Sequence, residues 1–263
     1  MTDIALYSKE IDASVIHFFD EIDSTNNYAK ELASKGAPAG TLVVAASQTS
    51  GRGRMGRAFQ SPSGSGIYMS LVLRPGEDFT DAVPVTSAAA VAVCRAIRQM
   101  TGADAGIKWV NDIYINEKKA CGILTEAVPD PSTGKLDSVV VGIGINFAKP
   151  SQEVIKSMPQ DVQERITWLY GSSEKPPVTP AQLTAKVVDE VIAVCREAKN
   201  RDYIAEYKKY SVILGRQIVF ISAGEKQNAL AQDIDKDGGL VVLMPDNTIK
   251  TLFSGEISVR WAD

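Results

Sequence analysis

The sequence predicts an α+β fold in which a mixed, mainly antiparallel sheet is flanked by helices and followed by a small C-terminal β-barrel. Strand-like segments between residues 107 and 147 follow one another across short turns, and strands joined in this way pair antiparallel. Residues 82–100 are rich in Ala and Val, which is typical of a long buried helix. Short apolar runs separated by turn residues fill the chain from residue 212 onward and indicate the barrel.

The first expected elements are one helix and two strands. Residues 24–35 (STNNYAKELASK) predict the helix, because Ser24 or Thr25 can cap its N-terminus and Gly36 can end it. Two apolar segments predict the strands, and a long loop rich in Gly, Ser and Arg separates them. The strands are residues 41–47 and 66–74, the loop is residues 48–65, and Pro75-Gly76 ends the second strand.

The middle of the chain predicts a run of strands and then helices. Residues 116–118 (NEK) are typical of a hairpin turn, and residues 129–135 (PDPSTGK) of a second turn. The strands expected around these turns are residues 107–109, 113–115, 119–127 and 137–147. The remaining segment, residues 151–209, has a mainly helical pattern that is broken by a loop at 171–177.

The composition changes near Val212, which divides the chain into two predicted domains, residues 1–211 and 212–263. Short apolar segments in the second domain predict strands, and Gly, Pro, Asn and Asp mark the turns between them. The strands expected are residues 217–222, 227–234, 239–244, 248–253 and 256–260, with turns at 223–225, 235–239 and 245–247.

Composition and charge limit the functional classes. The chain has 263 residues, of which 44% are hydrophobic and 23% charged, as in an ordinary globular protein. Its net charge of −4 disfavours nucleic acid as a partner, because proteins that grip phosphate backbones usually carry a basic surface. Three cysteines without a CxxC pair argue against a disulfide framework or a structural zinc site. A single histidine, His17, excludes a His-based metal cluster.

The N-terminal segment bears on the expected compartment. It carries acidic residues early and lacks the basic start and apolar run of a signal peptide. The most apolar stretches, residues 83–94 and 139–147, fall far short of the roughly 20 residues that span a bilayer. We therefore expect a cytoplasmic protein without a membrane partner.

The expected loop at 48–65 contains the run GRGRMGR, residues 51–57. The run matches the G-x-G-x-x-G pattern of dinucleotide sites, but that pattern needs a helix directly behind it. Here Pro62, Gly64 and Gly66 interrupt any helix. A loop that grips an anion fits better, since glycines let backbone N–H groups turn inward and arginines donate to phosphate or carboxylate. The plain alternative is a solvated basic loop.

Three further clusters carry polar or small residues at unusual places. KWVND (108–112) precedes KACGIL (119–124), and Gly122 in the latter allows a ligand or backbone to approach closely. Two glycines interrupt the apolar strand GIGIN (142–146), which costs stability unless something packs against them. DSTN (23–26) starts the first helix. Each cluster also has a purely structural explanation. KACGIL would be an ordinary edge strand, GIGIN a site of tight strand packing, and DSTN a plain helix cap.

Taken together and in this order, the clusters resemble the biotin protein ligases. The family pattern is STN at a helix start, GRGRxGR, KWPND, K-x-x-G-I-L and G-I-G-I-N, and the resemblance covers about residues 17–148. The last segment also looks like the small C-terminal β domain of the family, including GEIS at 255–258. Val110 stands where the commonest pattern has Pro, and Phe59 where many members carry Trp near the adenine. Both keep the apolar or aromatic character, so we expect little effect.

The resemblance implies a two-step reaction. Biotin and ATP, with Mg²⁺ accompanying the nucleotide, would form biotinyl-5′-AMP, and biotin would then pass to a lysine of a biotin carboxyl carrier protein. Some members also carry an N-terminal DNA-binding module and repress transcription. Because STN begins at residue 24, we expect a short form without that module and without a repressor role.

The resemblance also implies roles for individual residues. Lys119 is expected between the biotin carboxylate and the α-phosphate, Arg54 over the phosphates, and Asp112 beside the incoming amine; these are the expected catalytic residues. The expected biotin-binding residues are Ser24, Thr25, Asn26, Gln48, Gly51, Arg52, Gly53, Arg54, Lys119, Gly122 and Ile123. The expected ATP-binding residues are Arg54, Arg57, Phe59, Lys108, Asn111, Lys119 and Asn146. No metal-ligating residue is expected.

Three other functions remain as alternatives. A lipoate ligase shares the catalytic fold, but its His-Asp signature is absent here. A non-catalytic nucleotide-binding module would keep the Gly/Arg loop but has no need of Lys119 or Asp112. A phosphate-binding oxidoreductase would use the G-x-G-x-x-G run. The antiparallel sheet also leaves open a homodimer formed along an exposed strand edge.

Overall fold

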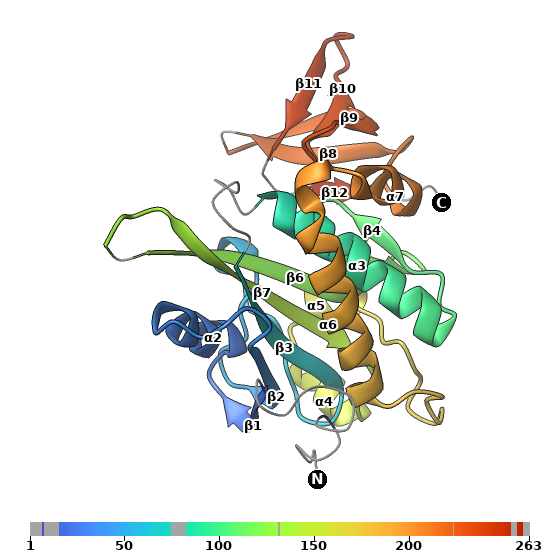
Figure 1. Cartoon of the computed structure of the whole chain (residues 1–263). Coiled ribbons are helices and arrows are strands. Elements are labelled where there is room, and N and C mark those ends of the chain that lie inside the picture. The colour runs from blue at the N-terminus through green and yellow to red at the C-terminus, as the bar shows by residue number, and fades with distance from the viewer. Residues whose placement is uncertain are drawn as a thin grey trace.

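The computed structural model describes residues 7, 16–74, 83–130, 132–222, 224–253 and 257–259 (Figure 1). Its helices are α2 (Thr25–Ser34), α3 (Val83–Thr101), α4 (Gln152–Ser157), α5 (Gln160–Arg165), α6 (Pro180–Arg196) and α7 (Tyr203–Tyr210), with 3-10 turns η2 (Arg54–Gly56) and η3 (Ala198–Asn200). The strands of the first sheet are β1 (Ile16–Ile22), β2 (Leu42–Gln48), β3 (Gly66–Leu73), β4 (Gly106–Lys108), β5 (Asp112–Ile115), β6 (Lys118–Pro129) and β7 (Leu136–Asn146). The strands of the second sheet are β8 (Gln217–Ser222), β9 (Glu225–Ile234), β10 (Leu240–Leu243), β11 (Ile249–Leu252) and β12 (Ile257–Val259).

The larger sheet has seven strands in the order β1-β2-β3-β7-β6-β5-β4. All neighbours pair antiparallel except β1 and β2, which are parallel. Two residues with positive φ, Asn116 and Glu117, form the tight turn between β5 and β6. The mainly antiparallel sheet was predicted, but β1 was not. The two parallel strands are connected through α2, as parallel pairing requires a crossover.

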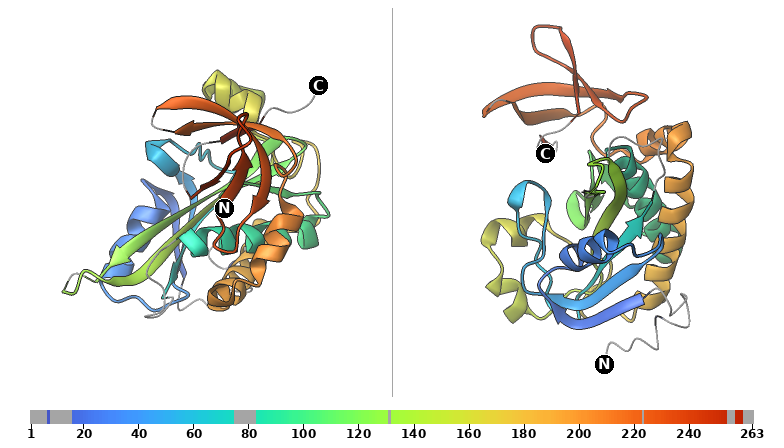
Figure 2. Two further views of the ribbon diagram at one scale, coloured as in Figure 1. Left: turned by 90° about the horizontal axis from the view of Figure 1, so that it is seen from above. Right: turned by 60° about the vertical axis from the view of Figure 1, so that its left-hand side comes forward.

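The two faces of this sheet bury different helices, as strand alternation requires. On one face α3 and α6 pack together over the strands, and Leu42, Leu71 and Val141 belong to the large core beneath them (Figures 1 and 2). On the other face α2 packs through Ala29 and Ala33 against a smaller cluster of valines. Those valines are Val43, Val72, Val128 and Val140. Because α2 covers only part of its face, the remainder is available for a site.

The smaller sheet has five strands in the order β11-β10-β9-β8-β12 and lies at one end of the molecule, beside α7 (Figure 2). Within the described residues it is an open sheet, so the predicted closed barrel is not shown. Its strands overlap the expected segments, although β9 begins at Glu225, inside the turn expected at 223–225. Gly106 of β4 sits where a Cβ would lie 2.3 Å from Val212, so the start of the second domain packs tightly against the first sheet.

The helices and strands lie close to the segments predicted for them, with local corrections. Ser24 occupies the N-cap position of α2, but its side chain makes no capping hydrogen bond. The expected strand 107–109 ends at Lys108, so Trp109 and Val110 lie in the turn before β5. Some predicted features fall on positions outside the described residues. These are Pro75-Gly76, residue 82 of the helix expected at 82–100, residues 131 and 223 of two predicted turns, residues 256 and 260 of the last expected strand, and residues 255–256 of the family-like GEIS. In the described part of the chain, no helix is long and apolar enough to cross a membrane.

Candidate active site

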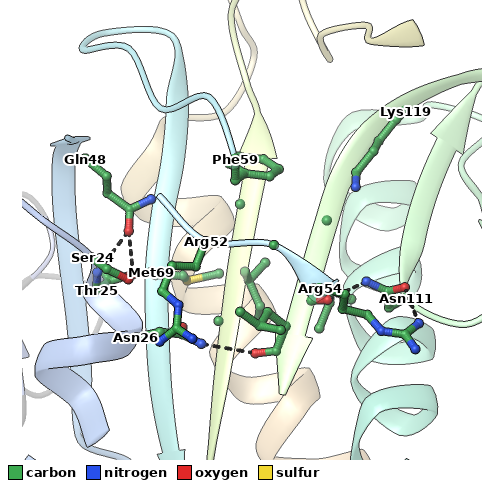
Figure 3. Close-up of a pocket in the computed structure, with 17 residues that line it drawn as sticks. Ser24, Thr25, Asn26, Gln48, Arg52, Arg54, Phe59, Met69, Asn111 and Lys119 are labelled. Atoms are coloured by element: carbon green, nitrogen blue, oxygen red, sulfur yellow. Dashed lines mark hydrogen bonds between the residues drawn. The ribbon is translucent and has the colours of Figure 1, made fainter. Parts of the chain in front are cut away.

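An open cleft lies on the α2 face of the large sheet, just beyond the N-terminus of α2 (Figure 3). Its floor comes from β3, β6 and β7, and its rim from the start of α2 and the loop after β2. The lining residues are Ser24, Thr25, Asn26, Gln48, Arg52, Gly53, Arg54, Phe59, Met69, Asn111, Lys119, Gly122, Ile123, Leu124, Gly142, Ile143 and Gly144.

The floor of the cleft exists because small residues replace valines on this face. Gly142 follows Val140 by two residues, so it points to the same side of β7, and a Cβ there would lie 2.0 Å from Asn26 Oδ1. A Cβ on Gly144 would lie 2.4 Å from the Phe59 ring. These two glycines therefore admit Asn26 and Phe59, which answers why they interrupt an apolar strand.

A connected set of neutral polar groups occupies the end of the cleft next to α2. The Gln48 Oε1 atom accepts from the Thr25 backbone N–H at 2.9 Å and from the Thr25 hydroxyl at 3.1 Å, while its Nε2 donates to Ser61 Oγ at 2.8 Å. The Ser70 hydroxyl lies 2.8 Å from Thr25 Oγ1 and 2.6 Å from Asn26 Oδ1. Ser70 is fully buried. Such an end suits a small neutral polar group with both donors and acceptors.

Cationic side chains approach from the loop that follows β2. The Arg52 guanidinium pairs with Glu126 at 3.2 Å and donates to Asn27 Oδ1 at 2.8 Å. Arg54 donates to Asn111 Oδ1 at 3.1 Å, on the side of the cleft away from Gln48 and Thr25 (Figure 3). The Gly53 N–H donates to the Arg57 carbonyl at 2.7 Å, so in this conformation it serves the loop itself and not the predicted anion nest.

Lys119 enters the cleft from the start of β6. Its ammonium lies 2.7 Å from Asp112 Oδ1 and 5.9 Å from the centre of the Phe59 ring. A Cβ on Gly122 would lie 3.0 Å from the Lys119 Nζ atom, so this glycine makes room for the lysine side chain. Lys119 is thus a partly exposed cation, held between a carboxylate and an aromatic face.

The turn at residues 109–111, directly before Asp112 of β5, is fixed from both sides. The Asn111 amide donates to the Ile123 carbonyl at 2.6 Å, and the Ile123 N–H donates to the Asn111 carbonyl at 3.0 Å. On the other side the Trp109 indole N–H donates to the Gly238 carbonyl of the small sheet at 2.9 Å, and the Tyr207 hydroxyl donates to the Val110 carbonyl at 3.1 Å. Asn111 and Asp112 are therefore positioned by α7 and the second domain as well as by β6.

The structure brings most residues expected at the site to the cleft lining and leaves five outside it. Asp112 reaches the cleft through its pair with Lys119, and Gly51 is packed beneath the loop, where a Cβ would lie 2.4 Å from the Phe59 carbonyl. Arg57 is exposed on the loop. Lys108 donates to Tyr114 at 3.3 Å, and the Asn146 amide donates to the carbonyls of Lys119 and Thr167.

Sequence reasoning missed several residues around the cleft. Gly142 and Gly144 were singled out within the GIGIN run, because a glycine pair inside an apolar strand marks a face that something approaches, but no site role was assigned to them. Ser70 and Glu126 carried no signal, because a single Ser or Glu inside a strand segment has no distinctive pattern. The missed residues are Ser61, Met69, Ser70 and Glu126. Four further residues of the cleft lining lie in runs that were singled out without a role for these positions, namely Leu124, Gly142, Ile143 and Gly144.

Comparison with known proteins agrees with this architecture. Residues 18–146 match the Biotin/lipoate A/B protein ligase family, and residues 213–260 match the Biotin protein ligase C terminal domain. The bifunctional ligase/repressor BirA of Bacillus spizizenii is 36% identical over 248 residues, covering 91% of this chain and 72% of that protein. The chain belongs to the biotin protein ligase family. It is an ATP-binding enzyme that ligates biotin to protein.

Two other relatives place the ligase within the family. The biotin–[acetyl-CoA-carboxylase] ligase of Mycobacterium tuberculosis is 27% identical over 239 residues, covering 86% of this chain and 82% of that protein. A solved structure of the Aquifex aeolicus biotin protein ligase in complex with biotin and ATP superposes with a TM-score of 0.76 at 26% identity, covering 94% of this chain and 99% of that one. The fold of the ligase is therefore that of the catalytic and C-terminal domains of the family.

Proposed function

We propose that the ligase first joins biotin and ATP into biotinyl-5′-AMP and then transfers biotin to a lysine of a biotin carboxyl carrier protein. The observation that carries the proposal is the division of one cleft into two chemical ends. Neutral polar groups around Thr25, Gln48 and Asn26 suit the ureido ring of biotin, and the cations Arg54 and Lys119 suit a carboxylate and phosphates.

In the first step a biotin carboxylate oxygen attacks the α-phosphorus of ATP. The new P–O bond forms as the bond to the bridging oxygen breaks, and pyrophosphate leaves with that electron pair. Negative charge gathers on the α-phosphate, so Lys119 and Arg54 act by electrostatic stabilisation and by holding the two anions together. Arg57, Phe59, Lys108, Asn111 and Asn146 are the further residues proposed to serve the nucleotide.

In the second step the amine of the acceptor lysine attacks the biotinyl carbonyl carbon, and AMP leaves as the C–O bond breaks. The amine must lose a proton when the amide forms. Asp112 is proposed to receive that proton or orient the amine, because its carboxylate already lies 2.7 Å from the Lys119 ammonium at the reacting end of the cleft.

The proposal includes Mg²⁺ only as a companion of the nucleotide. Among the described residues, no three His, Cys, Asp or Glu side chains gather where they could hold a metal ion. The ion would therefore bind to phosphate oxygens and water, which Mg²⁺ accepts readily, and would neutralise phosphate charge.

We further propose that the loop at residues 51–60 orders over the bound ligands. Its arginines lie on the rim, and a closed loop would shield the labile adenylate from water. A homodimer along the outer edge of β1 and the absence of DNA binding by this chain remain proposals as well, supported by the strand order and by the net charge of −4. Light scattering and a mobility shift with operator-like DNA at low salt test them.

Biotin-dependent exchange between ATP and labelled pyrophosphate tests the proposed function directly. Exchange with biotin but not with lipoate is the expected result, and transfer to a purified carrier domain should follow in the same assay. Exchange with lipoate alone would show that the acid substrate is lipoate, and it would leave the assignment of the fold unchanged. The absence of exchange with either acid would contradict the adenylation proposal and first of all the role of Lys119.

A further inference from the structure

Glu126 lies on β6 beside the cleft and uses both carboxylate oxygens at once. Its Oε2 atom accepts from the Asn26 amide at 2.9 Å, while Oε1 accepts from Lys30 at 2.8 Å and pairs with Arg52 at 3.2 Å. The side chain is only 18% exposed, so these contacts are shielded from water. No step of the proposed reaction uses Glu126.

One oxygen of Glu126 determines which way the Asn26 amide points. A carboxylate can only accept hydrogen bonds, so the amide must turn its NH₂ group toward Glu126 and its oxygen toward Ser70. A weaker contact from the same NH₂ group to the Leu124 carbonyl, at 3.4 Å, agrees with this orientation. Glu126 therefore presents the Asn26 oxygen to the polar end of the cleft.

The other oxygen holds the loop. Arg52 lies between two glycines, Gly51 and Gly53, whose backbone has no side chain to stiffen it. Both contacts described for the Arg52 guanidinium end on groups beside α2, namely Glu126 and the Asn27 carbonyl oxygen Oδ1. Burial by itself raises the pKa of Glu126, but hydrogen bonds from Lys30 and Asn26 and the charges of Lys30 and Arg52 outweigh it and lower the pKa. The carboxylate is thus charged at neutral pH.

We propose that Glu126 is a positioning residue that couples biotin recognition to closure of the 51–60 loop, by orienting Asn26 with one oxygen and holding Arg52 with the other. The inference rests on the proposed biotin site. Biotin that fixes Asn26 also fixes Glu126, which then holds Arg52 more firmly, so ligand binding and loop closure reinforce each other.

The test is Glu126→Gln, which keeps the shape but offers one oxygen and one NH₂ group. The variant cannot accept from Asn26 with one end and from both cations with the other. We expect the KM for biotin in pyrophosphate exchange to rise about tenfold while kcat changes less than twofold. We also expect trypsin, in the presence of biotin, to cleave the variant after Arg54 several-fold faster than it cleaves the wild-type ligase.

Glu190→Gln is the matched control. Glu190 on α6 is a 12% exposed carboxylate that pairs with Arg95 and Lys186 away from the cleft. This control should lower thermal stability and leave the KM for biotin unchanged. If Glu126→Gln lowered stability in the same way with an unchanged KM and an unchanged cleavage rate, Glu126 would be structural only and the inference overturned.

Arg52→Gln, a change on the exposed loop, is the second variant and completes a double-mutant cycle. We expect the double variant to resemble the worse single variant, because both changes remove the same contact. Additive effects on the KM for biotin would overturn the coupling even if Glu126→Gln folded poorly. Failure of the wild-type ligase to exchange with biotin would instead overturn the proposed function, so the two outcomes are distinguishable.

Discussion

At the scale of single residues, the absence of side chains at two glycines shapes the cleft as much as the side chains that line it. Gly142 lies between Ser70 of β3 and Leu124 of β6, and Gly144 lies between Tyr68 and Gly122. Two residues earlier on β7, Val140 supports α2. The change from Val to Gly along one face of one strand converts a helix-packing surface into a floor that side chains and ligand can approach.

Gly142→Ala should therefore disturb the cleft at its floor, by displacing Asn26. The new Cβ would lie 2.0 Å from Asn26 Oδ1, so Asn26 must move out of its bond with Ser70. We expect the KM for biotin to rise at least tenfold and the free energy of unfolding to fall by about 1–3 kcal/mol. Ser138→Ala is the control on the same strand, because its buried hydroxyl has no hydrogen-bond partner among the residues that the structure describes. Equal KM values for Gly142→Ala and wild type would argue against Asn26 as a biotin ligand.

Lys119→Ala should act on chemistry more than on binding. Lys119 is the proposed donor to the charge that develops at the α-phosphate, so without its ammonium adenylate formation should slow by about 10²–10³-fold. Biotin binding should persist in part, because the polar end of the cleft is intact. Single-turnover formation of biotinyl-5′-AMP measures this step, and Lys118→Ala, one residue away and exposed, is the control. An unchanged single-turnover rate would remove Lys119 from the mechanism.

The residues predicted from sequence were those that belong to a multi-residue pattern. STN, GRGRMGR, KWVND and KACGIL each contribute side chains to the cleft or its immediate support. Ser70 and Glu126 were not predicted, because their contacts with Asn26 depend on strand register. The two residues come to lie beside Asn26 only after β3, β6 and β7 have paired. Register depends on long-range pairing and is not encoded in a short window.

At the scale of elements, the strands joined by tight turns were predictable and the edge strand was not. The β5–β6 hairpin has a local signal in Asn116 and Glu117, which adopt positive φ in the turn. In contrast, β1 pairs in parallel with β2 across the whole of α2, so no local turn marks it. The sequence likewise predicted strands for the second domain, but whether they close into a barrel depends on distant pairings.

Three helices are joined by one ion cluster, which makes their packing sensitive to pH. Arg95 on α3 contacts Glu190 on α6 at 2.8 Å and also Glu206 on α7. Hydrogen bonding with Arg95 lowers the pKa of Glu206. Burial raises the pKa of Glu190, but hydrogen bonds from Lys186 and Arg95 more than offset this, so its pKa is lowered as well. Folded protein therefore binds fewer protons than unfolded protein at mildly acidic pH, and stability rises with pH there.

Arg95→Gln should lower the free energy of unfolding by about 2 kcal/mol at neutral pH, the size expected for hydrogen bonds between charged groups with limited exposure. The stabilisation is fully present above the ordinary glutamate pKa of 4.5 and is lost as pH falls through the lower folded values. The difference between wild type and variant should therefore shrink below about pH 4. Urea unfolding at several pH values measures it, and a difference independent of pH would contradict the assignment.

The control for this series is Glu31→Gln, which breaks the pair of Glu31 with Lys35 on α2. Both side chains are more than half exposed, at 55% and 68%. Such a pair contributes little, so we expect a change below about 0.5 kcal/mol at any pH.

At the scale of the whole molecule, the two sheets share one functional turn. The bond from Trp109 to Gly238 and the bond from Tyr207 to Val110 hold the turn that carries Asn111 and Asp112. Trp109 is buried, with 4% of its surface exposed, so this contact is protected from water. The second domain therefore belongs to the structural support of the cleft.

Trp109→Phe should weaken that support while keeping most of the packing. The lost hydrogen bond is worth about 1 kcal/mol, and we expect roughly a fivefold slower transfer of biotin to a carrier domain. Tyr207→Phe should act in the same direction. Tyr203→Phe is the control, because its hydroxyl bonds Ser87 and Pro84 and does not touch the turn. If all three variants lost activity in proportion to stability alone, the turn would have no special role.

The bond from Trp109 to Gly238 joins residues 129 positions apart in the sequence. Synthesis on the ribosome runs from the N-terminus, so every residue that lines the cleft emerges well before the carbonyl that anchors the turn. Such a distant contact can form only after a long stretch of chain has been released. We therefore expect a nascent chain that ends before Gly238 to hold the cleft residues without their full support, so that activity matures only after Gly238 has been released.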